Sequence, residues 1–533
     1  MKWVATTLLW WLVLFNLPLG AFPVHGDQGA LPAGTELNED ALDKPREVFR
    51  SEAMGGRKSY LVNFGDVAFS SPAILGGVAR QAGISCSTCH VNGASNPKFY
   101  IPRLSGRPGT FITTGALFNA KADNRLLDPL TIPSLRGTRS LAPYGHDGRA
   151  ASLRDFVHNV IVNEFAGPEP SPAILDAIVA YIQDIDFLPN PRLAPGGRLT
   201  AQASVPERRG ETLFTKPFPH DPTLSCAGCH VPSAAFADHL QHDVGSGGLY
   251  KTPTLRNANF NARYFHDGRY DSYDEVVAHF DRVFDLGLSP DEREDLAAYL
   301  TAVGDGEQPY DADGVIPRLK EVEDFASVLK TAIPAHDTEV IALTVNTVGG
   351  ELRELIESFP ARKDTSVSGG EEERDIARAL LKELVLALRR IDLAAAAGQF
   401  DDAATEYGNL RKLTEPEGAI PAALQNAERW SLFNPPFMSV TTQRCEKCTA
   451  QPVAPIADAL NGWRQIGHDR AEEFDRGSDA ARAMRNARAV QTHFDTSKCA
   501  AQHQIIEMPE MADAEHPSPQ LAEAGPKRHV ERL

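Results

Sequence analysis

The sequence is poor in methionine, tryptophan and cysteine, and basic residues are not in excess. No methionine lies between Met54 and Met438, which excludes a methionine sulfur ligand from the middle of the chain. Lysine and arginine number 53 against 71 aspartates and glutamates, so the formal net charge is −18. Nucleic-acid binding needs a basic stripe, and this composition therefore excludes nucleic acid as a partner. Beyond the N-terminal segment, no run is apolar enough to cross a membrane.

The N-terminal segment has the features of an export signal. One lysine, Lys2, precedes an apolar run from Trp3 to Phe22, and small residues follow near Ala21 and Gly26. This pattern predicts a secretory signal peptide over residues 1–26. The alternative is a transmembrane anchor, so a membrane association is expected only if the segment stays uncleaved. Both interpretations place the rest of the chain outside the cytoplasm, and we expect a periplasmic protein.

Two short motifs carry the strongest signal for function. They are Cys86-Ser87-Thr88-Cys89-His90 and Cys226-Ala227-Gly228-Cys229-His230. Two cysteines three apart followed by a histidine form the attachment site of c-type haem, in which both thiols bind the porphyrin and the imidazole binds iron. A structural zinc site or small disulfide loops are the alternatives, but no second ligand pair follows either motif closely. We predict two covalently bound c-type haems, with His90 and His230 as iron ligands.

The sequence around the two motifs is repeated. The matching segments are 131–136 and 251–256, then Tyr144-Gly145-His146-Asp147-Gly148-Arg149 and Tyr264-Phe265-His266-Asp267-Gly268-Arg269. Helices are predicted at 71–82, 152–162, 206–214 and 272–283, with further helices opening at Ser171 and Ser289. The same order of motif and helix starts predicts two copies of one small helical haem domain.

The chain changes character after the second copy. Apolar residues recur at helical spacing in residues 340–359, 371–397 and 401–413; Ile376, Leu380, Leu384 and Ile391 are an example. Gly398 is placed to end the second of these helices. Beyond residue 435 the chain is polar, Cys445 and Cys448 suggest a disulfide, and residues 470–533 suggest disorder.

These patterns predict an all-α protein: two tandem cytochrome c-like domains, a helical C-terminal region and a partly disordered tail. The expected parts are 1–26 signal peptide, 27–60 linker or arm, 61–195 first cytochrome c-like domain, 200–308 second cytochrome c-like domain, 315–434 helical bundle and 435–533 polar tail.

The second axial position of each haem iron is harder to assign. Neither repeat contains a methionine, so a histidine is the available strong ligand. The candidates are His146 and His158 in the first repeat and His220, His239, His242, His266 and His279 in the second. For each of these histidines there is an equally good alternative to iron ligation. It could lie at the protein surface, or it could support the site from outside the iron's coordination sphere.

His146 and His266 lie in matching turns, so we expect them to share one role. The turn offers an imidazole, a carboxylate to orient it, and an arginine, Arg149 or Arg269, suited to a haem propionate. We favour a supporting position beside the haem over iron ligation for both histidines. Both arginines are counted among the candidate catalytic residues.

The residues resemble the bacterial di-haem cytochrome c peroxidase and MauG family. The resemblance covers about residues 60–305 and rests on the two CxxCH motifs, on 252–257, on 264–269 and on 273–280. It implies two all-α cytochrome c domains. The N-terminal haem would react with hydrogen peroxide, and the C-terminal haem would take electrons from a small donor protein, a cytochrome c or a cupredoxin.

The sequence departs from the family at two places. The family's distal Met or Tyr position is Phe280 here, which makes the neighbouring His279 the first candidate for that ligand. The peroxidases place a tryptophan between the haems, whereas residues 12–429 contain none. A peroxidase also needs an acid–base group over the open iron. Asp155 or Glu275 are candidates, the alternative being exposed helix carboxylates.

Three functions fit this sequence. The first is an exported di-haem oxidoreductase that reduces hydrogen peroxide at the haem on His90 with electrons arriving through the haem on His230. The second is a di-haem electron-transfer protein without peroxidase activity. The third is a MauG-like oxidation of a protein or organic substrate. Of the three, we expect the first.

Overall fold

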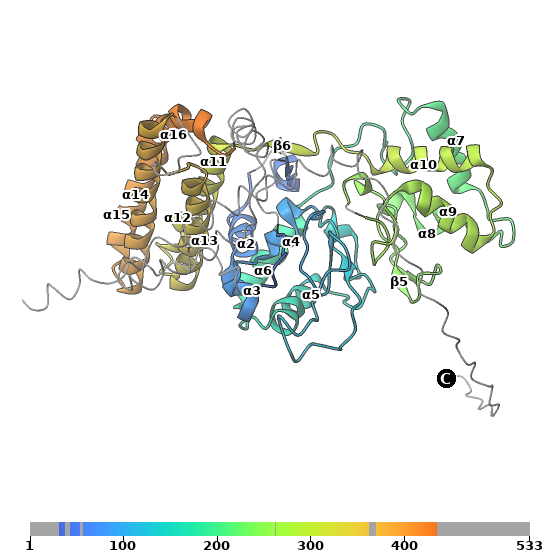
Figure 1. The fold of residues 1–533 in the computed structure, drawn as a ribbon, viewed down its shortest axis with the longest axis horizontal. Helices are drawn as coiled ribbons and strands as arrows, with labels where there is room; N and C mark the ends of the chain where they lie inside the picture. The colour runs from blue at the N-terminus through green and yellow to red at the C-terminus, as the bar shows by residue number, and fades with distance from the viewer. Residues whose placement is uncertain (1–30, 38–42, 54–56, 262, 362–368, 434–533) are drawn as a thin grey trace, which may run out of the picture. The chain divides into compact units, whose positions relative to one another are not determined.

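The computed structural model describes residues 31–37, 43–53, 57–261, 263–361 and 369–433, all of which belong to one compact unit (Figure 1). The expected signal peptide, the cysteines beyond residue 444 and the expected disordered tail lie outside the described residues. Within these ranges the chain is mostly helical, as predicted, and its strands form three two-stranded pairs. None of the helices in this part combines the length and the apolar character that a membrane span requires.

The first repeat is built on a pair of packed helices. Its helices are α2 (Tyr60–Phe69), α3 (Gly77–Gln81), α4 (Cys86–Cys89), α5 (Leu153–Asn159) and α6 (Pro172–Asp184), preceded by α1 (Arg50–Ala53). α2 packs along α6, and Gly65 makes the close approach possible, because a Cβ there would lie 1.9 Å from the carbonyl oxygen of Ala177. Phe69 and Tyr181 meet in this contact and are both 2% exposed.

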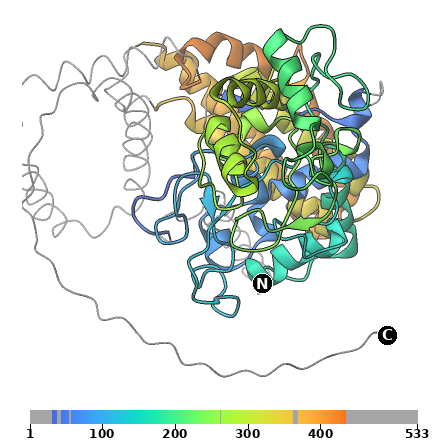
Figure 2. The same ribbon diagram turned by 90° about the vertical axis from the view of Figure 1, so that its right-hand side faces the viewer.

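The second repeat builds the same contact from different residues. Its helices are α7 (Val205–Thr215), α8 (Cys226–Cys229), α9 (Tyr273–Phe284) and α10 (Pro290–Gly304), which Figure 2 brings to the front. α7 packs on α10, and a Cβ on Gly210 would lie 2.0 Å from the carbonyl oxygen of Asp295. Ser272 and Ser289 begin α9 and α10 through capping boxes, as the sequence predicts at Ser289.

One prediction for the first repeat was wrong in detail, and one helix was missed. The helix expected at 71–82 is a 3₁₀ turn, Pro72–Ile74, followed by the short α3, because Leu75 and Gly76 between them are extended and Gly77, the first residue of α3, has a positive φ of 51°. The capping serine, Ser71, is placed as predicted and accepts a hydrogen bond from the backbone of Ala73. α2 was not predicted at all, although its Gly65 and Phe69 repeat the spacing of Gly210 and Phe214.

The C-terminal helices confirm the three predicted by periodicity and add three more. They are α11 (Val315–Ala326), α12 (Leu329–Ala332), α13 (Thr338–Glu357), α14 (Glu371–Ala396), α15 (Phe400–Thr414) and α16 (Ala419–Ala427). Leu384 and Ile391 are fully buried on α14, whereas Ile376 is 47% exposed and was wrongly placed on the same face. α11 and α13 contact α2, so this helical region packs against the first repeat.

Short antiparallel strand pairs join distant segments. β1 (Asp43–Pro45) pairs with β6 (Tyr310–Ala312), β2 (Thr110–Phe111) with β3 (Leu130–Thr131), and β4 (Gln241–His242) with β5 (Tyr250–Lys251). The first pair ties the N-terminal arm to the segment that follows the second repeat. Leu37 and Phe49 of this arm are buried, so the described part of the arm is docked and not a free linker.

Candidate functional site

The first CxxCH motif forms one turn of helix that ends at its histidine. Ser85 and Thr88 cap the turn, with the backbone N–H of Ser85 donating to the Thr88 hydroxyl at 3.0 Å. The Nδ1–H of His90 donates to the carbonyl oxygen of Pro133 at 3.0 Å. Removal from water lowers the pKa of His90 to about 4, so the ring is neutral. Its Nε2 therefore carries a lone pair suited to a metal.

The second motif has the same geometry. The Ser225 hydroxyl accepts a hydrogen bond from the backbone of Gly228 at 3.1 Å and starts the turn. The Nδ1–H of His230 donates to the carbonyl oxygen of Phe236 at 3.1 Å. Burial again lowers the pKa of the imidazole. Both predicted iron ligands are thus fixed in the tautomer that leaves Nε2 free to bind iron.

Cys86, Cys226 and Cys229 are not in disulfide bonds, so neither of the small disulfide loops considered as an alternative is formed. Loss of solvent raises the pKa of the Cys86 thiol to about 12 and that of the Cys226 thiol to about 11. Both therefore carry their protons. Two cysteines at this spacing before a histidine form the attachment pattern of c-type haem.

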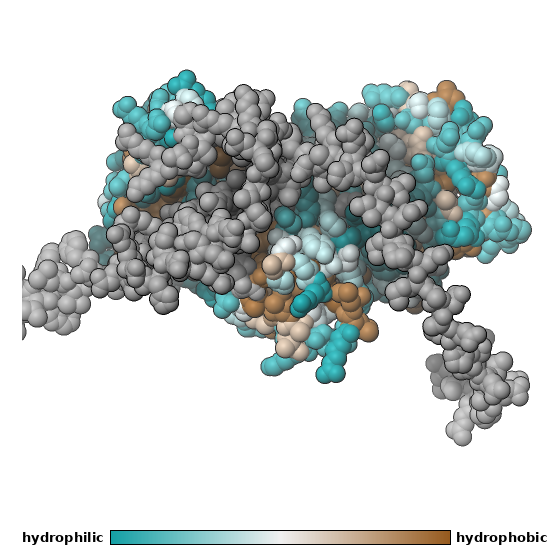
Figure 3. Space-filling model, in the orientation of Figure 1, coloured by the Kyte–Doolittle hydropathy of each residue, from teal (hydrophilic) through white to brown (hydrophobic). Residues whose placement is uncertain are grey.

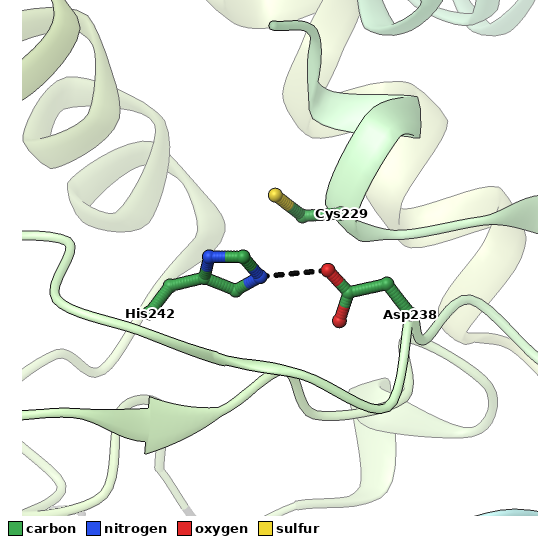
Figure 4. A group of neighbouring side chains, drawn as sticks. All are labelled: Cys229, Asp238 and His242. Atoms are coloured by element: carbon green, nitrogen blue, oxygen red, sulfur yellow. Dashed lines mark hydrogen bonds and ion pairs between the residues drawn. The ribbon is translucent and has the colours of Figure 1, made fainter. Parts of the chain in front are cut away.

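Cys229 also lies beside a histidine–carboxylate pair. The ligand atoms of Cys229, Asp238 and His242 lie within 4.8 Å of one another, and Nε2 of His242 is 2.7 Å from the Asp238 carboxylate (Figure 4). A structural zinc site takes four ligands, and here one of three belongs to the haem motif and the other two bind each other. The geometry therefore favours a histidine oriented by its carboxylate next to the Cys229 sulfur over a zinc site.

Two buried arginines offer hydrogen bonds that the described residues do not use. Arg136 and Arg256 end the matching segments 131–136 and 251–256, and Nε of each is buried without a partner in the described part of the chain. Arg136 is 2% exposed, and the guanidinium of Arg256 lies 4.7 Å over the ring of Phe187. Burying an unused N–H is costly, and a carboxylate is the preferred partner of a guanidinium. The residues present therefore fit the propionates of two porphyrins.

The sequence assigned this propionate role to other arginines. Arg149 donates instead to Asp147 at 3.1 Å and to Glu164 at 3.0 Å, and Arg269 binds Asp267 at 2.9 Å. The turn's carboxylate thus binds its arginine and not its histidine, contrary to the expectation that it would orient the imidazole. The repeated arginine of segments 131–136 and 251–256 was the signal that could have found Arg136 and Arg256.

The two histidine turns dock on the opposite repeat. The backbone N–H of Thr131 in β3 donates to the carbonyl of His266 at 2.7 Å, and the N–H of Lys251 in β5 donates to the carbonyl of His146 at 2.8 Å. Within the first repeat, the Nε2–H of His146 donates to the carbonyl of Thr131 at 2.8 Å. The ring of His266 stacks on Tyr250 at 3.6 Å and 11°. This crossed contact brings both predicted turns to the junction of the repeats.

Lys251 adds a buried cation to the same junction. Its Nζ donates to the carbonyl oxygens of Leu141 and Pro143, each at 2.7 Å. Burial lowers the pKa of Lys251 to about 8. Lys251 was not among the predicted site residues, because only the folded chain shows that position 251 lies against the other repeat.

His279 lies in a polar pocket at the side of an aromatic cluster. It is 3% exposed, its Nε2–H donates to the carbonyl of Val244 at 2.7 Å, and its Nδ1 accepts from the Tyr270 hydroxyl at 2.8 Å. Both His279 and Phe280 pack with Phe265, at 4.7 and 5.8 Å between ring centroids. Both nitrogens of His279 are thus engaged in this arrangement, and its assignment as a distal ligand stays a prediction.

The remaining candidates lie at the surface. Asp155 and Glu275 are exposed in the first turns of α5 and α9, where Glu275 accepts hydrogen bonds from the backbone of Asp271 and Ser272 at 2.8 and 3.1 Å. His158 pairs with Glu169 and His220 with Asp285. The predicted acid–base role of the two carboxylates is not tested by this placement and stays a prediction.

The segments between each cysteine motif and its histidine turn expose large apolar side chains. Leu126 and Leu127 are 64% and 63% exposed in the first repeat, and Leu240 and Leu249 are 59% and 60% exposed in the second. Figure 3 shows apolar side chains gathered on the lower side of the described chain in that view. Exposed leucines in this segment of each repeat fit a surface that an apolar group such as a porphyrin covers.

Comparisons with known proteins relate this site to a family. Residues 208–349 match the family model described as di-haem cytochrome c peroxidase, from within α7 to within α13. The hydrazine synthase subunit gamma of Kuenenia stuttgartiensis is 24% identical over 326 residues, which are 50% of this chain and 83% of that protein. A solved structure of Kuenenia stuttgartiensis hydrazine synthase, pressurized with xenon, covers 50% of this chain and 90% of its own at 22% identity and a TM-score of 0.34.

The matched region contains the second cysteine motif, the arginine at 256, the second histidine turn and α9, on which the sequence resemblance rested together with the first cysteine motif. The first motif lies before the matched residues and repeats their geometry at His90 and Arg136. The family prediction is confirmed to this extent: residues 208–349 of this chain match the model of the di-haem cytochrome c peroxidase family.

Proposed function

We propose that this protein is an exported di-haem c-type cytochrome that reduces hydrogen peroxide with electrons from a small donor protein. The observation that supports it most directly is the duplicated site. Each repeat presents two cysteines at haem-attachment spacing, an imidazole held through Nδ1, and an arginine whose buried Nε–H has no partner in the described part of the chain. The family match supports haem redox chemistry and leaves the choice of reaction to experiment.

Each residue has a distinct task in this proposal. Cys86 and Cys89 would tether one haem and His90 would bind its iron; Cys226, Cys229 and His230 would do the same in the second repeat. Arg136 and Arg256 bind propionate carboxylates and neutralise charge that would otherwise be buried. When bound, the haems supply the iron at which peroxide is reduced and the path by which electrons enter.

The proposal includes two tandem cytochrome c-like domains, at residues 61–195 and 200–308. The equivalent contacts of α2 with α6 and of α7 with α10 support it, as do the matching cysteine turns. Electron exchange between the repeats would use the crossed contact of the two histidine turns. No tryptophan lies there, and the stacked Tyr250 and His266 are the aromatic pair at that junction.

The donor and the compartment are also proposals. A surface with a net charge of −18 attracts a basic partner, and a small basic cytochrome c or cupredoxin fits. Covalent haem attachment in bacteria takes place outside the cytoplasm, which agrees with the predicted signal peptide over residues 1–26. Association with a membrane is expected only if that segment is retained.

The test is peroxide-dependent oxidation of a reduced small cytochrome c by the haem-loaded full chain. We expect turnover, a high-spin ferric signal from one haem, and loss of turnover in His90→Ala. His220→Ala is the matched control, because His220 is exposed and paired with Asp285, and it should turn over normally. Two low-spin signals in every oxidation state with no reaction with peroxide would contradict the proposal and favour a plain electron carrier.

A second candidate follows from the similarity to a hydrazine synthase subunit gamma over 83% of that relative. In this interpretation the chain is the haem-carrying subunit of a larger enzyme that acts on nitrogen compounds. It predicts no peroxidase turnover by the isolated chain and co-purification with other subunits from the native host. MauG-like oxidation of a protein or organic substrate is the third, and it predicts peroxide consumption without oxidation of the small cytochrome.

A further inference from the structure

A row of aromatic rings leads from the first haem ligand into the core of the first repeat. The ring of Phe69 lies 6.5 Å from that of His90, and the ring of Tyr181 lies 5.0 Å from Phe69. Both spacings lie in the range of interacting aromatic pairs. Phe69 and Tyr181 are each 2% exposed, so water does not separate the rings.

The far end of this row has a proton acceptor. The Tyr181 hydroxyl donates to Oε1 of Glu47 at 2.6 Å. Glu47 belongs to the docked arm, and its other oxygen lies 3.8 Å from Nζ of Lys58, which is itself 2.8 Å from the Asp66 carboxylate. Burial raises the pKa of Tyr181 well above its usual value, so the resting side chain is a neutral phenol. The phenol proton therefore faces a carboxylate in a charged cluster that the proposed function does not use.

This arrangement meets the requirement for one-electron oxidation of a buried tyrosine. A phenol that loses an electron becomes a strong acid, and a buried phenol has no water to take its proton. The base must then lie within hydrogen-bonding distance of the hydroxyl. Glu47 satisfies that condition. The ammonium group of Lys58 lies beside the Glu47 carboxylate and stabilises it before the proton arrives.

We propose that Tyr181 is a redox-active residue that stores one oxidising equivalent in the first repeat. One electron passes from the Tyr181 ring through Phe69 and His90 to the first haem after hydrogen peroxide has oxidised it. The phenolic O–H bond breaks, its proton forms a new O–H bond on Glu47, and a neutral phenoxyl radical remains on Tyr181. The inference rests on the proposed function, because peroxide is the oxidant that it names.

The second repeat contains the same rings without the acceptor. Tyr299 lies 4.8 Å from Phe214, and Phe214 lies 6.4 Å from His230. Among the described residues, no hydrogen bond joins the Tyr299 hydroxyl to a carboxylate, and burial, with the nearby charge of Glu211, raises the pKa of Tyr299. Tyr299 is therefore a matched internal control, with equal packing and no partner to receive the proton.

Packing alone also explains an aromatic residue at position 181. Tyr181 packs against α2 where Gly65 allows the two helices to touch, and a phenylalanine would fill the same space. A packing role does not need the hydroxyl, the Glu47 carboxylate or the difference between the repeats. Tyr181→Phe therefore removes the redox function and keeps the fold, which a thermal unfolding curve and the haem absorption spectrum would verify.

The experiment is electron paramagnetic resonance on the full-length haem-loaded protein, frozen after mixing with hydrogen peroxide. We expect a radical signal that narrows when the protein contains ring-deuterated tyrosine. The signal should be lost in Tyr181→Phe and unchanged in Tyr299→Phe. In Glu47→Gln, which keeps a hydrogen-bond acceptor but is a far weaker base, the radical yield should fall by about tenfold or more.

A second arm separates this inference from the proposed function. If peroxide leaves the haem spectrum unchanged, the peroxidase proposal fails, and photogenerated ruthenium(III) tris-bipyridine then supplies the oxidant to the same variants. A tyrosyl signal that depends on Tyr181 and Glu47 in this arm would support the inference by itself. A signal that survives in Tyr181→Phe, one that disappears in Tyr299→Phe, or no tyrosyl signal in either arm would overturn it.

Discussion

The contact between α7 and α10 supports the second haem site, and Gly210 is the residue that tests it. A Cβ at position 210 would lie 2.0 Å from the carbonyl oxygen of Asp295 and 2.6 Å from Cβ of Tyr299. Carbon contacts are normally about 3.5 Å or longer, so Gly210→Ala forces the helices apart by roughly 1 Å or more. The obstacle is a backbone carbonyl, which cannot rotate away.

The expected cost follows from two opposing effects. Overpacking of a tight contact costs about 1–3 kcal/mol and occasionally more, while alanine is about 1 kcal/mol better than glycine in a helix. Because the clash is with backbone, we expect a net loss of about 2–3 kcal/mol in the local free energy of unfolding. The displacement also moves Phe214, whose ring lies 6.4 Å from that of His230, so the spectrum of the second haem should change.

Hydrogen exchange followed by mass spectrometry measures this loss element by element. In Gly210→Ala, protected amides of α7 and α10 should exchange roughly 30- to 160-fold faster, while those of α2 and α6 keep their rates. Gly408→Ala is the control, because Gly408 lies in α15, where a Cβ would meet no other part of the described chain within 4 Å, and it should be neutral or stabilising by up to about 1 kcal/mol. Equal behaviour of the two variants would refute the close packing of α7 on α10.

Three further predictions address the junction, the arginines and the C-terminal helices. Burial lowers the pKa of Lys251 to about 8 from 10.5, so the unfolded chain binds more protons between these values and the native state gains stability as the pH rises through them. Between pH 7 and a pH above 10.5, the free energy of unfolding of the parent should rise by about 3 kcal/mol more than that of Lys251→Met. Unfolding curves of both proteins at the two pH values measure this difference. Arg136→Gln and Arg256→Gln should each lower the reduction potential of one haem in a spectroelectrochemical titration, because loss of a nearby positive charge favours oxidised iron; unchanged potentials would contradict the propionate contacts. Leu384→Ala should cost about 2–5 kcal/mol in urea unfolding because Leu384 is fully buried, whereas Ile376→Ala, at a 47% exposed site, should cost less than about 1 kcal/mol.

Local signals in the sequence were sufficient to predict much of the helical structure. The capping box at Ser289 and Glu292 begins α10 where the sequence predicted it, and the periodicity of residues 371–397 predicted α14 nearly to its ends. α2 was missed because its apolar residues do not face one side only: eight consecutive residues, Val62 to Phe69, are buried between α6 and the C-terminal helices. Such a helix shows no amphipathic pattern.

The site residues also fall into two groups, those that a local sequence pattern predicts and those that it does not. Thiols and iron ligands follow from spacing alone, because a CxxCH turn places them within one turn of helix. The roles of Thr131 and Lys251 depend on backbone hydrogen bonds between segments that are more than a hundred residues apart. No local sequence pattern predicts such a contact. The histidine turns show the same limit: their repetition was visible, but the partner of each imidazole and arginine depended on the folded chain.

The central claim is that two haems are covalently attached, one at each CxxCH turn. The most direct test is the intact mass of the exported full chain under denaturing conditions, together with its absorption spectrum. If both haems are attached, the measured mass exceeds the mass of the processed polypeptide by two haem groups. The Soret band then survives denaturation and solvent extraction. A colourless protein with the mass of the bare chain would contradict it.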